Sequence, residues 1–488
     1  MKLINYSHDR NANFKKSSDE FFNLIEKFGE EKKIESFFNH YEKRYSIPKK
    51  VLKQSIKHNI AQNYGYRSSR FGKNLRLITL PLSIVKYFGF LLLSLIYSRK
   101  KRYNKHYKLI VDEIDLSRYL HRYKKLINLF GKEDVLVIAT EEIDVNEFPD
   151  YNIKSLKLFK YHDRFEVLKV IYYELFFGFW ICLKTSIQVN LNLFQESNSI
   201  IKTLIQYKSL FKSYSADYLF QERLYTTNAI KNYLFKESGG FATSTMQKSI
   251  LEIDKLSYYI DSDYFFSLGN LTTEKAFHYG GRIDHAIPVG SMLMEYYWFS
   301  DPKPVEKNID VIMLGINTMN AYERLDKYTE FLDDYYNSIR WLVRFKEQHP
   351  SFSIGIKHHA SAGKDVIEDK IISNSGIELL PKTKNSYKLA FQSRCVVTWG
   401  STMGYEMSAH GVPSFFLDPG NRNSFLYDLR NEKFEHLLLD NYDAFQDALI
   451  SVLNKSNKKN YDDDKELWNN LCLDSHNVSK KIYKTFCN

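Results

Sequence analysis

The second half of the chain alternates short apolar runs with longer segments in which apolar residues recur at helical spacing. The apolar runs have the length of strands and lie at 309–314, 352–357, 377–379, 395–399 and 414–417. The helical spacing is found between them, at 322–348, 366–373, 386–392 and 402–410. Strands separated by helices predict right-handed βαβ units, and therefore a doubly wound domain on a parallel sheet.

The first half shows a weaker form of the same alternation. Strand-like runs lie at 109–111, 135–140, 153–159, 218–222 and 241–244, with helical patterns at 165–187, 199–214 and 226–236. Residues 14–58 are polar with apolar positions at helical spacing, which predicts short amphipathic helices. A chain of 488 residues is too long for one ordinary core. We therefore predict an α/β fold with a helical N-terminal region, 1–106, and two Rossmann-like domains, 107–300 and 301–488, the second including the terminal helices.

The most apolar segment, 77–97, is long enough to cross a bilayer, which needs about 20 residues. Pro81 and Lys86 interrupt it, and basic residues flank it on both sides, whereas a spanning helix normally has its cations on one side. A helix lying in the membrane surface explains both features, and a buried core helix is an equal alternative. The aromatic stretch 170–182, with Glu174 at its centre, is predicted to be a core helix.

Composition narrows the class of protein. With 44% apolar and 26% charged residues, and no Pro, Gly or Ser tract, the chain is globular. A net charge of +11 favours an anionic partner, but the cations are spread along the chain and match no DNA-reading or RNA-reading motif, so we expect no nucleic acid. The four scattered cysteines predict neither a zinc site nor disulfides. The N-terminal residues lack the apolar core of a secretory signal, so we expect a cytoplasmic location.

The loops at the carboxyl ends of the strands are where a doubly wound sheet binds its ligands. The most informative of them lies within 396–420, VVTWGSTMGYEMSAHGVPSFFLDPG. A strand ends at Trp399, Gly400 and Ser401 form a turn, and a helix opens at Thr402. Helix N-termini favour anions such as pyrophosphate, so Gly400, Ser401 and Thr402 are predicted phosphate contacts. A simple helix cap by Ser401 or Thr402 is compatible with that role.

Glu406 is the acidic residue of the same helix. A capping-box glutamate stands three residues after the cap, which would be position 404 or 405, so capping does not explain it. Its place on a partly apolar face near the glycine turn predicts hydrogen bonds to ribose hydroxyls. The alternative is a solvated or ion-paired glutamate.

The run WGSTMGYEMSAHGVPSFF resembles the C-terminal signature of bacterial surface-polysaccharide glycosyltransferases with a GT-B fold, including the Kdo-transferase and sialyltransferase-like capsule enzymes. The matching residues are Gly400, Ser401, Thr402, Gly404, Glu406, Gly411 and Pro413, and a weaker similarity covers about 217–417. The resemblance implies two Rossmann-like domains that face each other across a cleft, and a nucleotide sugar bound by the second. It implies phosphate contacts from the turn, ribose contact from Glu406, and no requirement for a metal.

The segment IGIKHHASAG resembles the place where these enzymes carry Lys-x-His-Pro. Lys357 and His358 are present, but His359 stands where that pattern would continue and the proline is missing, so Lys357 is the better candidate for a phosphate charge. Gly315 and Asn317 follow the first strand of this domain and are either ligand contacts or an ordinary turn. Adjacent histidines on a strand point to opposite faces, so we predict no metal site.

Glycosyl transfer also needs a group that takes the proton of the acceptor hydroxyl. Glu141 and Glu142 directly follow the strand 135–140 and are the predicted catalytic residues, with solvated loop acids as the alternative. Asp163 and Glu222 are weaker candidates.

These features together predict a cytoplasmic glycosyltransferase held at the inner face of the membrane. It would move a sugar from a nucleotide-sugar donor to a glycan or lipid-linked glycan acceptor of capsule or lipopolysaccharide, with no cofactor besides the donor. A polyol-phosphate transferase of teichoic-acid type and a nucleotide-sugar epimerase are alternatives on the same scaffold. A basic protein that binds membranes or nucleic acid is the alternative from a different class.

Overall fold

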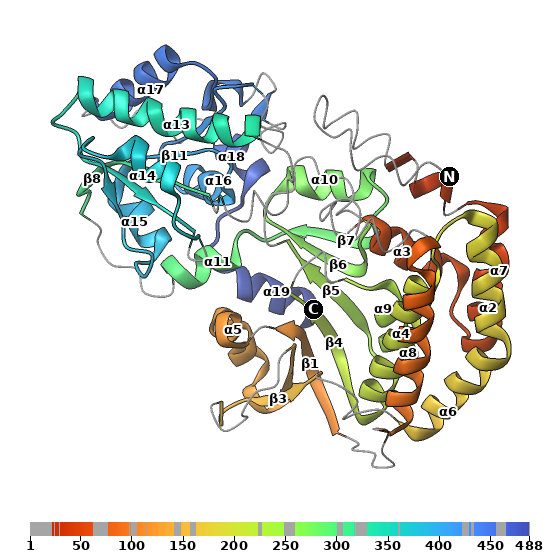
Figure 1. The fold of residues 1–488 in the computed structure, drawn as a ribbon. Coiled ribbons are helices and arrows are strands. Elements are labelled where there is room, and N and C mark those ends of the chain that lie inside the picture. The colour runs from red at the N-terminus through yellow and green to blue at the C-terminus, as the bar shows by residue number, and fades with distance from the viewer. Residues whose placement is uncertain are drawn as a thin grey trace.

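The structure is a computed structural model with two lobes, joined around α11 (Met292–Met294), α18 (Lys465–Leu471) and α19 (Val478–Cys487) (Figure 1). The residues that it describes are 22–23, 25–28, 30–61, 77–96, 98, 105–114, 116–140, 148–156, 163–222, 227–247, 259–299, 306–316, 318, 329–359, 362–421, 429–430, 434–454 and 465–487.

The first lobe is built on seven parallel strands in the order β3-β2-β1-β4-β5-β6-β7. Their bounds are β1 (Lys105–Ile114), β2 (Val135–Ala139), β3 (Asn152–Ser155), β4 (Tyr214–Gln221), β5 (Ala242–Met246), β6 (Asp261–Ser267) and β7 (Arg282–Pro288). In the register, Ile110 of β1 is opposite Leu136 on one side and Leu219 on the other. Every residue of β2 and β5 is buried, as expected for parallel strands that are covered on both faces.

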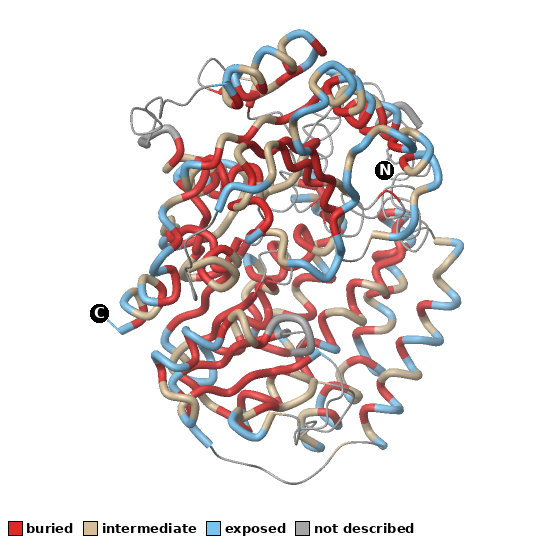
Figure 2. The backbone as a smooth tube through the Cα atoms, turned by 90° about the vertical axis from the view of Figure 1, so that its left-hand side faces the viewer, coloured by how far each residue is buried: buried red, intermediate tan, exposed pale blue. Residues whose placement is uncertain are grey.

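The second lobe is built on six parallel strands in the order β10-β9-β8-β11-β12-β13. Their bounds are β8 (Ile309–Leu314), β9 (Ile354–Lys357), β10 (Glu378–Leu379), β11 (Ser393–Thr398), β12 (Ser414–Leu417) and β13 (Leu438–Leu439). Both sheets therefore begin with the order 3-2-1-4-5-6, the arrangement of a Rossmann domain, and the prediction of two such domains is confirmed. The strands of both sheets run through the buried interior, while exposed positions recur along the helices (Figure 2).

Helices cover both sheets. Those of the first lobe are α5 (Leu116–Phe130), η6 (Lys132–Asp134), α6 (Arg164–Tyr173), η8 (Glu174–Gly178), α7 (Phe179–Val189), α8 (Phe194–Ser213), α9 (Ala229–Glu237) and α10 (Asn270–His278). The π-helical turn η11 (Glu295–Phe299) follows α11. Those of the second lobe are α13 (Thr329–Gln348), α14 (Val366–Ile372), α15 (Ser386–Gln392), α16 (Thr402–Ser408), η13 (Glu435–Leu437) and α17 (Tyr442–Asn454).

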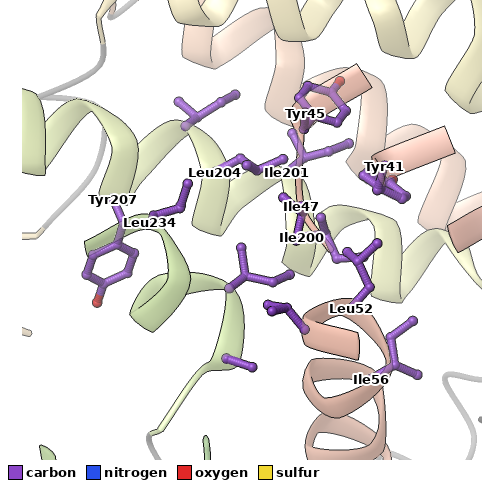
Figure 3. Close-up of a cluster of buried hydrophobic side chains, with 14 of the residues drawn as sticks. Tyr41, Tyr45, Ile47, Leu52, Ile56, Ile200, Ile201, Leu204, Tyr207 and Leu234 are labelled. Atoms are coloured by element: carbon purple, nitrogen blue, oxygen red, sulfur yellow. The ribbon is translucent and has the colours of Figure 1, made fainter. Parts of the chain in front are cut away.

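The N-terminal helices are part of the first lobe and share its core. They are η2 (Lys32–Ile34), α2 (Glu35–Tyr45), α3 (Lys49–Ile60), η5 (Leu77–Thr79) and α4 (Leu80–Ile96). Tyr41 and Leu52 from this region belong to the same apolar cluster as Ile201, Leu204 and Leu234 of α8 and α9 (Figure 3). From residue 22 on, the amphipathic helices predicted within 14–58 are present, and α2 and α3 pack on α7 and α9.

The last helix, α19, packs on the first lobe. The prediction had placed it in the second domain, 301–488. Val478, Ile482 and Phe486 are spaced four residues apart, and all three are buried in the core that β1, β2 and α5 share. The ring of Phe486 stacks on Tyr218 of β4, with centroids 4.7 Å apart. The sequence gives α19 an apolar stripe but does not say which sheet will bury it.

The prediction of a core helix at 170–182 was wrong in part. α6, η8 and α7 follow one another without a break, and one side of this long helix faces away from the protein. Leu175, Phe176 and Trp180 are exposed, whereas Glu174 is completely buried. Val170 and Cys182 are buried in the core, as predicted, but large apolar side chains are exposed on the opposite side, where an ordinary surface helix would be polar.

Candidate functional site

The carboxyl ends of β8, β9 and β11 form the edge of the second sheet where its strand order reverses. β8 lies between β9 and β11, so the loops that leave β8 and β11 serve opposite halves of the sheet. Such edges are where doubly wound sheets bind ligands. The predicted residues that the structure places at this edge are Gly315, Lys357, His358, Gly400, Ser401 and Thr402. Asn317 lies outside the described residues.

The turn after β11 is organised by the hydroxyl of Thr398. This oxygen accepts hydrogen bonds from the amides of Gly400 and Ser401, at 3.2 and 2.9 Å. Ser401 caps α16, because its side chain accepts from the amide of Met403. A phosphate that bound here would have to replace Thr398 as the acceptor of two amides. The capping role is observed, and the phosphate role of the turn stays a prediction.

Glu406 is buried where α16 meets the segment that joins the two sheets. One of its carboxylate oxygens accepts from the hydroxyl of Ser291, and the other from the hydroxyl of Tyr387 at 2.8 Å. Burial raises the pKa of Glu406 to about 7, against the lowering effect of these two hydrogen bonds. Both oxygens are engaged within the protein, so this arrangement does not offer them to a ribose, and that role stays a prediction.

His358 and Glu368 form a pair at the end of β9. His358 Nε2 lies 3.0 Å from Glu368 Oε1, and Glu368, which is almost completely buried on α14, also accepts from the hydroxyl of Tyr335 at 3.2 Å. The other ring nitrogen, Nδ1, faces Gly315, where an added Cβ would lie 2.8 Å from it. A glycine is needed at 315 for this close approach. A carboxylate thus orients the His358 ring at the ligand edge, although the sequence ranked His358 below Lys357.

The ammonium of Lys357 is bonded to backbone carbonyls of the loops around it. Its side chain is buried, and the ammonium donates to the carbonyls of His358 and Lys382, both at 3.1 Å. Burial, and then the charge of Lys382, lowers its pKa. The expectation of a phosphate charge at Lys357 is not supported by this geometry, because its donors are already used by the loop that it stabilises.

A pocket opens at the carboxyl edge of the first sheet, beside the junction of the lobes. It is small and partly open to solvent, and is lined by Arg122, Tyr123, Glu222, Met246, Gln247, Leu268, Ser291, Met292 and Leu293. Glu222 directly follows β4, and Arg122 comes from α5. The pocket therefore brings a carboxylate and a guanidinium together at the edge where a Rossmann domain binds its ligand.

Arg122 also connects the pocket to the second lobe. Its guanidinium donates to the hydroxyl of Tyr297 at 3.1 Å, and the Tyr297 ring stacks on Tyr387 of α15, with centroids 5.4 Å apart. Ser291 lines the pocket as well and is bonded to Glu406 on α16, the helix that begins at the glycine turn. The ligand edges of the two sheets therefore adjoin the same junction.

The predicted catalytic pair, Glu141 and Glu142, lies outside the described residues. Asp163 is a helix cap, because its carboxylate accepts from the amides of residues 165 and 166 at the start of α6. Glu222 is the remaining candidate, and it is in the pocket. The sequence ranked Glu222 below Glu141 and Glu142, because nothing local shows which loop borders the second lobe. Arg122, Ser291 and Tyr387 gave no signal of their own.

Among the residues that the structure describes, no group of three or more His, Cys, Asp or Glu side chains is placed to hold a metal ion. All four cysteines are free thiols, and Cys487 is exposed.

No protein-family model matches the chain, and no curated protein sequence matches it. Solved structures with a similar arrangement include UDP-GlcNAc 2-epimerase from Neisseria meningitidis bound to UDP-GlcNAc, with 10% identity over 79% of this chain and 100% of that one and a TM-score of 0.46. The UDP-GlcNAc 2-epimerase of Methanocaldococcus jannaschii has 12% identity over 78% of this chain and 100% of that one, with a TM-score of 0.45.

An O-GlcNAc transferase mutant from Thermobaculum terrenum has 9% identity over 93% of this chain and 80% of that one, with a TM-score of 0.37. Likenesses at this level carry no argument about activity. The assignment of the fold rests on the strand order of the two sheets.

Proposed function

We propose that this protein is a glycosyltransferase that binds a nucleotide-sugar donor on its second domain and an acceptor in the pocket of its first. The observation that carries the proposal is the double role of Ser291, which lines the pocket and also binds Glu406 on α16. Because the ligand edges of both sheets adjoin this junction, a donor on one domain and an acceptor on the other could meet there. The motif at 396–420 supports a bacterial surface glycan, lipid-linked, as the acceptor.

In the proposed reaction the acceptor hydroxyl attacks the anomeric carbon of the donor sugar. The bond between that carbon and the phosphate oxygen breaks, and the nucleotide leaves with the bonding electron pair. The carboxylate of Glu222 takes the proton of the hydroxyl, since it is the acidic group of the pocket. Arg122 supplies positive charge on the same wall, and His358, held by Glu368, is the group at the second edge that contacts the leaving diphosphate.

The donor is identified by the thermal midpoint of the purified protein in the presence of CMP-, UDP-, GDP- and CDP-linked sugars. A ligand that binds only the folded state raises the midpoint by mass action. We expect one nucleotide class to stabilise the protein, and His358→Ala to lose most of that shift. His436→Ala, a change in a histidine near β13 outside the ligand edge, is the control and should keep it. If none of the four nucleotide classes stabilises the wild type, the donor site does not lie at this edge.

The reaction is identified by its products with the stabilising donor. Transfer releases the nucleotide, and Glu222→Gln should keep the thermal shift but lower the rate of release by about a hundredfold or more, the usual contribution of a general base. Glu274→Gln, at an exposed position on α10, is the matched control. A donor recovered intact as a nucleotide sugar with one inverted sugar carbon would identify an epimerase and overturn the transferase proposal. Transfer of a polyol phosphate would identify the other alternative on this scaffold.

A further inference from the structure

Two neighbouring helices of the first lobe present their apolar side chains to the outside. Most of the exposed large apolar residues in the described part of the chain lie on α4, with the short turn before it, and on the helix formed by α6, η8 and α7. Examples are Leu82, Val85 and Leu92 on the first helix and Leu175, Phe176 and Trp180 on the second. The two outer surfaces adjoin where the rings of Phe88 and Phe179 meet, with centroids 5.4 Å apart. Exposed apolar surface of this extent marks an interaction site.

The inner surfaces of the same helices combine core apolar residues, such as Leu91, Val170 and Cys182, with buried polar groups. On α4, Ser83 accepts from Asn192 at 2.7 Å and Tyr87 donates to Glu174 at 2.7 Å. Glu174 itself comes from η8 and is completely buried. A surface helix that faced water would have mainly polar residues on its outer side. The large exposed apolar area of these two helices therefore indicates that their outer surface faces an apolar medium.

Buried polar groups of the inner surface are hydrogen-bonded to one another. Glu174 accepts hydrogen bonds from Tyr45 at 2.6 Å and from Tyr87, and it lies 3.1 Å from His40 Nε2. Burial, and then the charge of Glu174, raises the pKa of both tyrosines, so they remain donors. An alanine at 178 would place its Cβ against the Glu174 carboxylate, so Gly178 is needed for this packing. The two helices are thus tied to the soluble lobe and are not free to leave it.

The charges of the outer surface have one sign. Lys86 of α4 and Arg164, Lys169 and Lys184 of α6 and α7 are exposed. Neither helix has an exposed carboxylate, because Glu174 is buried and Glu166 is paired with Lys208 and Lys212. Cations around an apolar surface with aromatic side chains are complementary to the headgroup region of an anionic bilayer.

We infer that the outer surface of α4 and of the α6–η8–α7 helix is a membrane-docking face that lies in the interface of an anionic bilayer without crossing it. Leu77–Ile96 is long and apolar enough to span, and only 22% of its apolar window is buried, so it is not an ordinary core helix. Its inner side is nevertheless bonded to η8 and to the loop before α8, which fixes it parallel to the protein surface. The face includes α6 and α7, which form the outer margin of the first lobe in Figure 1, in addition to the segment 77–97.

The test is flotation of the purified full chain with vesicles of phosphatidylglycerol and phosphatidylcholine, compared with vesicles of phosphatidylcholine alone. We expect binding to the anionic vesicles that weakens as salt is raised, and at least about a tenfold loss for Phe176→Ser/Trp180→Ser, since each large apolar side chain withdrawn from water contributes strongly. The matched control is Val366→Ser/Ile367→Ser, a pair with similar exposure on α14 of the second lobe, which should bind like the wild type. Lys169→Gln and Lys184→Gln should each lower the binding about fivefold.

The fluorescence of Trp180 can report contact of this face with a membrane, because Trp180 is 62% exposed while the other four tryptophans are half-buried or buried. Its fluorescence should shift to the blue on anionic vesicles, and Trp180→Phe should abolish that shift. No flotation of the wild type, or equal flotation of the Phe176→Ser/Trp180→Ser variant with an unchanged thermal midpoint, overturns the inference. A dimer that this variant splits, in a protein that does not bind vesicles, would assign the face to a second copy instead. The test uses no sugar nucleotide, so its result is independent of the proposed reaction.

Discussion

The long helix α13 of the second lobe and the α6–η8–α7 helix of the first differ in their outer sides. α13 buries Leu332, Tyr335, Ile339, Leu342 and Phe345 against its sheet and exposes Asp333, Arg340, Arg344 and Glu347. The α6–η8–α7 helix buries Val170 and Cys182 together with Glu174, and it exposes Leu175, Phe176 and Trp180. Both contain enough apolar residues to be taken for core helices, so the difference shows that burial is decided by which side meets the sheet and not by apolar content.

The difference also changes what holds each helix in place. α13 is held by removal of apolar surface from water, which is insensitive to any single polar contact. The α6–η8–α7 helix is held on its inner side by apolar burial and, in addition, by hydrogen bonds between buried polar groups, of which Glu174 accepts several. Loss of one member of such a network leaves its partners buried without a bond, which is costly.

The largest effect that tests this comparison is expected for Glu174→Ala. Removal of the carboxylate leaves Tyr45, Tyr87 and His40 buried without their common partner, and we expect a loss of about 3 to 5 kcal/mol in the free energy of unfolding. Glu174→Gln, which keeps an acceptor, should lose clearly less. Urea unfolding followed by tryptophan fluorescence measures both, and equal losses would show that the hydrogen bonds do not matter.

The counterpart on α13 is Leu342→Ala, in which a completely buried side chain is truncated. We expect a loss of about 2 to 4 kcal/mol, because the lost burial and the cavity both destabilise the second lobe. Leu92→Ala on α4, where the side chain is exposed, is the control and should change the unfolding free energy by less than about 0.5 kcal/mol. A large effect at Leu92 would show that the outer side of α4 is packed in solution.

Glu406 is a buried glutamate of the second lobe with a raised pKa, so its effect on stability depends on pH. Its pKa is about 7 in the folded protein and near 4.5 when exposed, so the folded state holds the proton more tightly. Its contribution to stability is therefore complete below pH 4.5 and is lost as the pH rises through 7. Between pH 5 and 8 the wild type should lose about 2 to 3 kcal/mol more than Glu406→Gln. Parallel stability curves for the two proteins would mean that Glu406 does not titrate in this range.

The smallest effect is expected for Leu175→Gln on the outer side of the α6–η8–α7 helix. The side chain already faces away from the protein, so we expect the unfolding free energy to change by less than about 0.5 kcal/mol. Ile339→Gln at a buried position of α13 is the contrasting change and should be strongly destabilising, since it buries an amide among apolar groups. Similar losses of unfolding free energy at the two positions would contradict the difference between the two helices.

In the second lobe, the architecture could be predicted from the local pattern of apolar and polar residues alone. The strand 309–314 was placed as the structure has it, and the strands 395–399 and 414–417 within two residues, because parallel strands buried on both faces read as short apolar runs. The cap at Ser401 and the loops at the carboxyl edge were also predictable, since both depend on neighbours in the chain. The site was only partly predictable. Ser291, Arg122 and Tyr387 acquire their roles from residues more than fifteen positions away.

The sequence by itself determined the α/β class, the two-domain organisation and the loops at the carboxyl edges of the sheets, because these are set by periodicity within single elements. The tertiary structure alone decided that α19 returns to the first lobe, that Glu406 bonds to Ser291 and Tyr387, and that α6 and α7 leave large apolar side chains exposed. The physical reason is the same in all three cases. A pattern tells which side of a helix is apolar, but the partner of each side, whether a sheet, a second domain or an apolar medium, is chosen by packing over the whole chain.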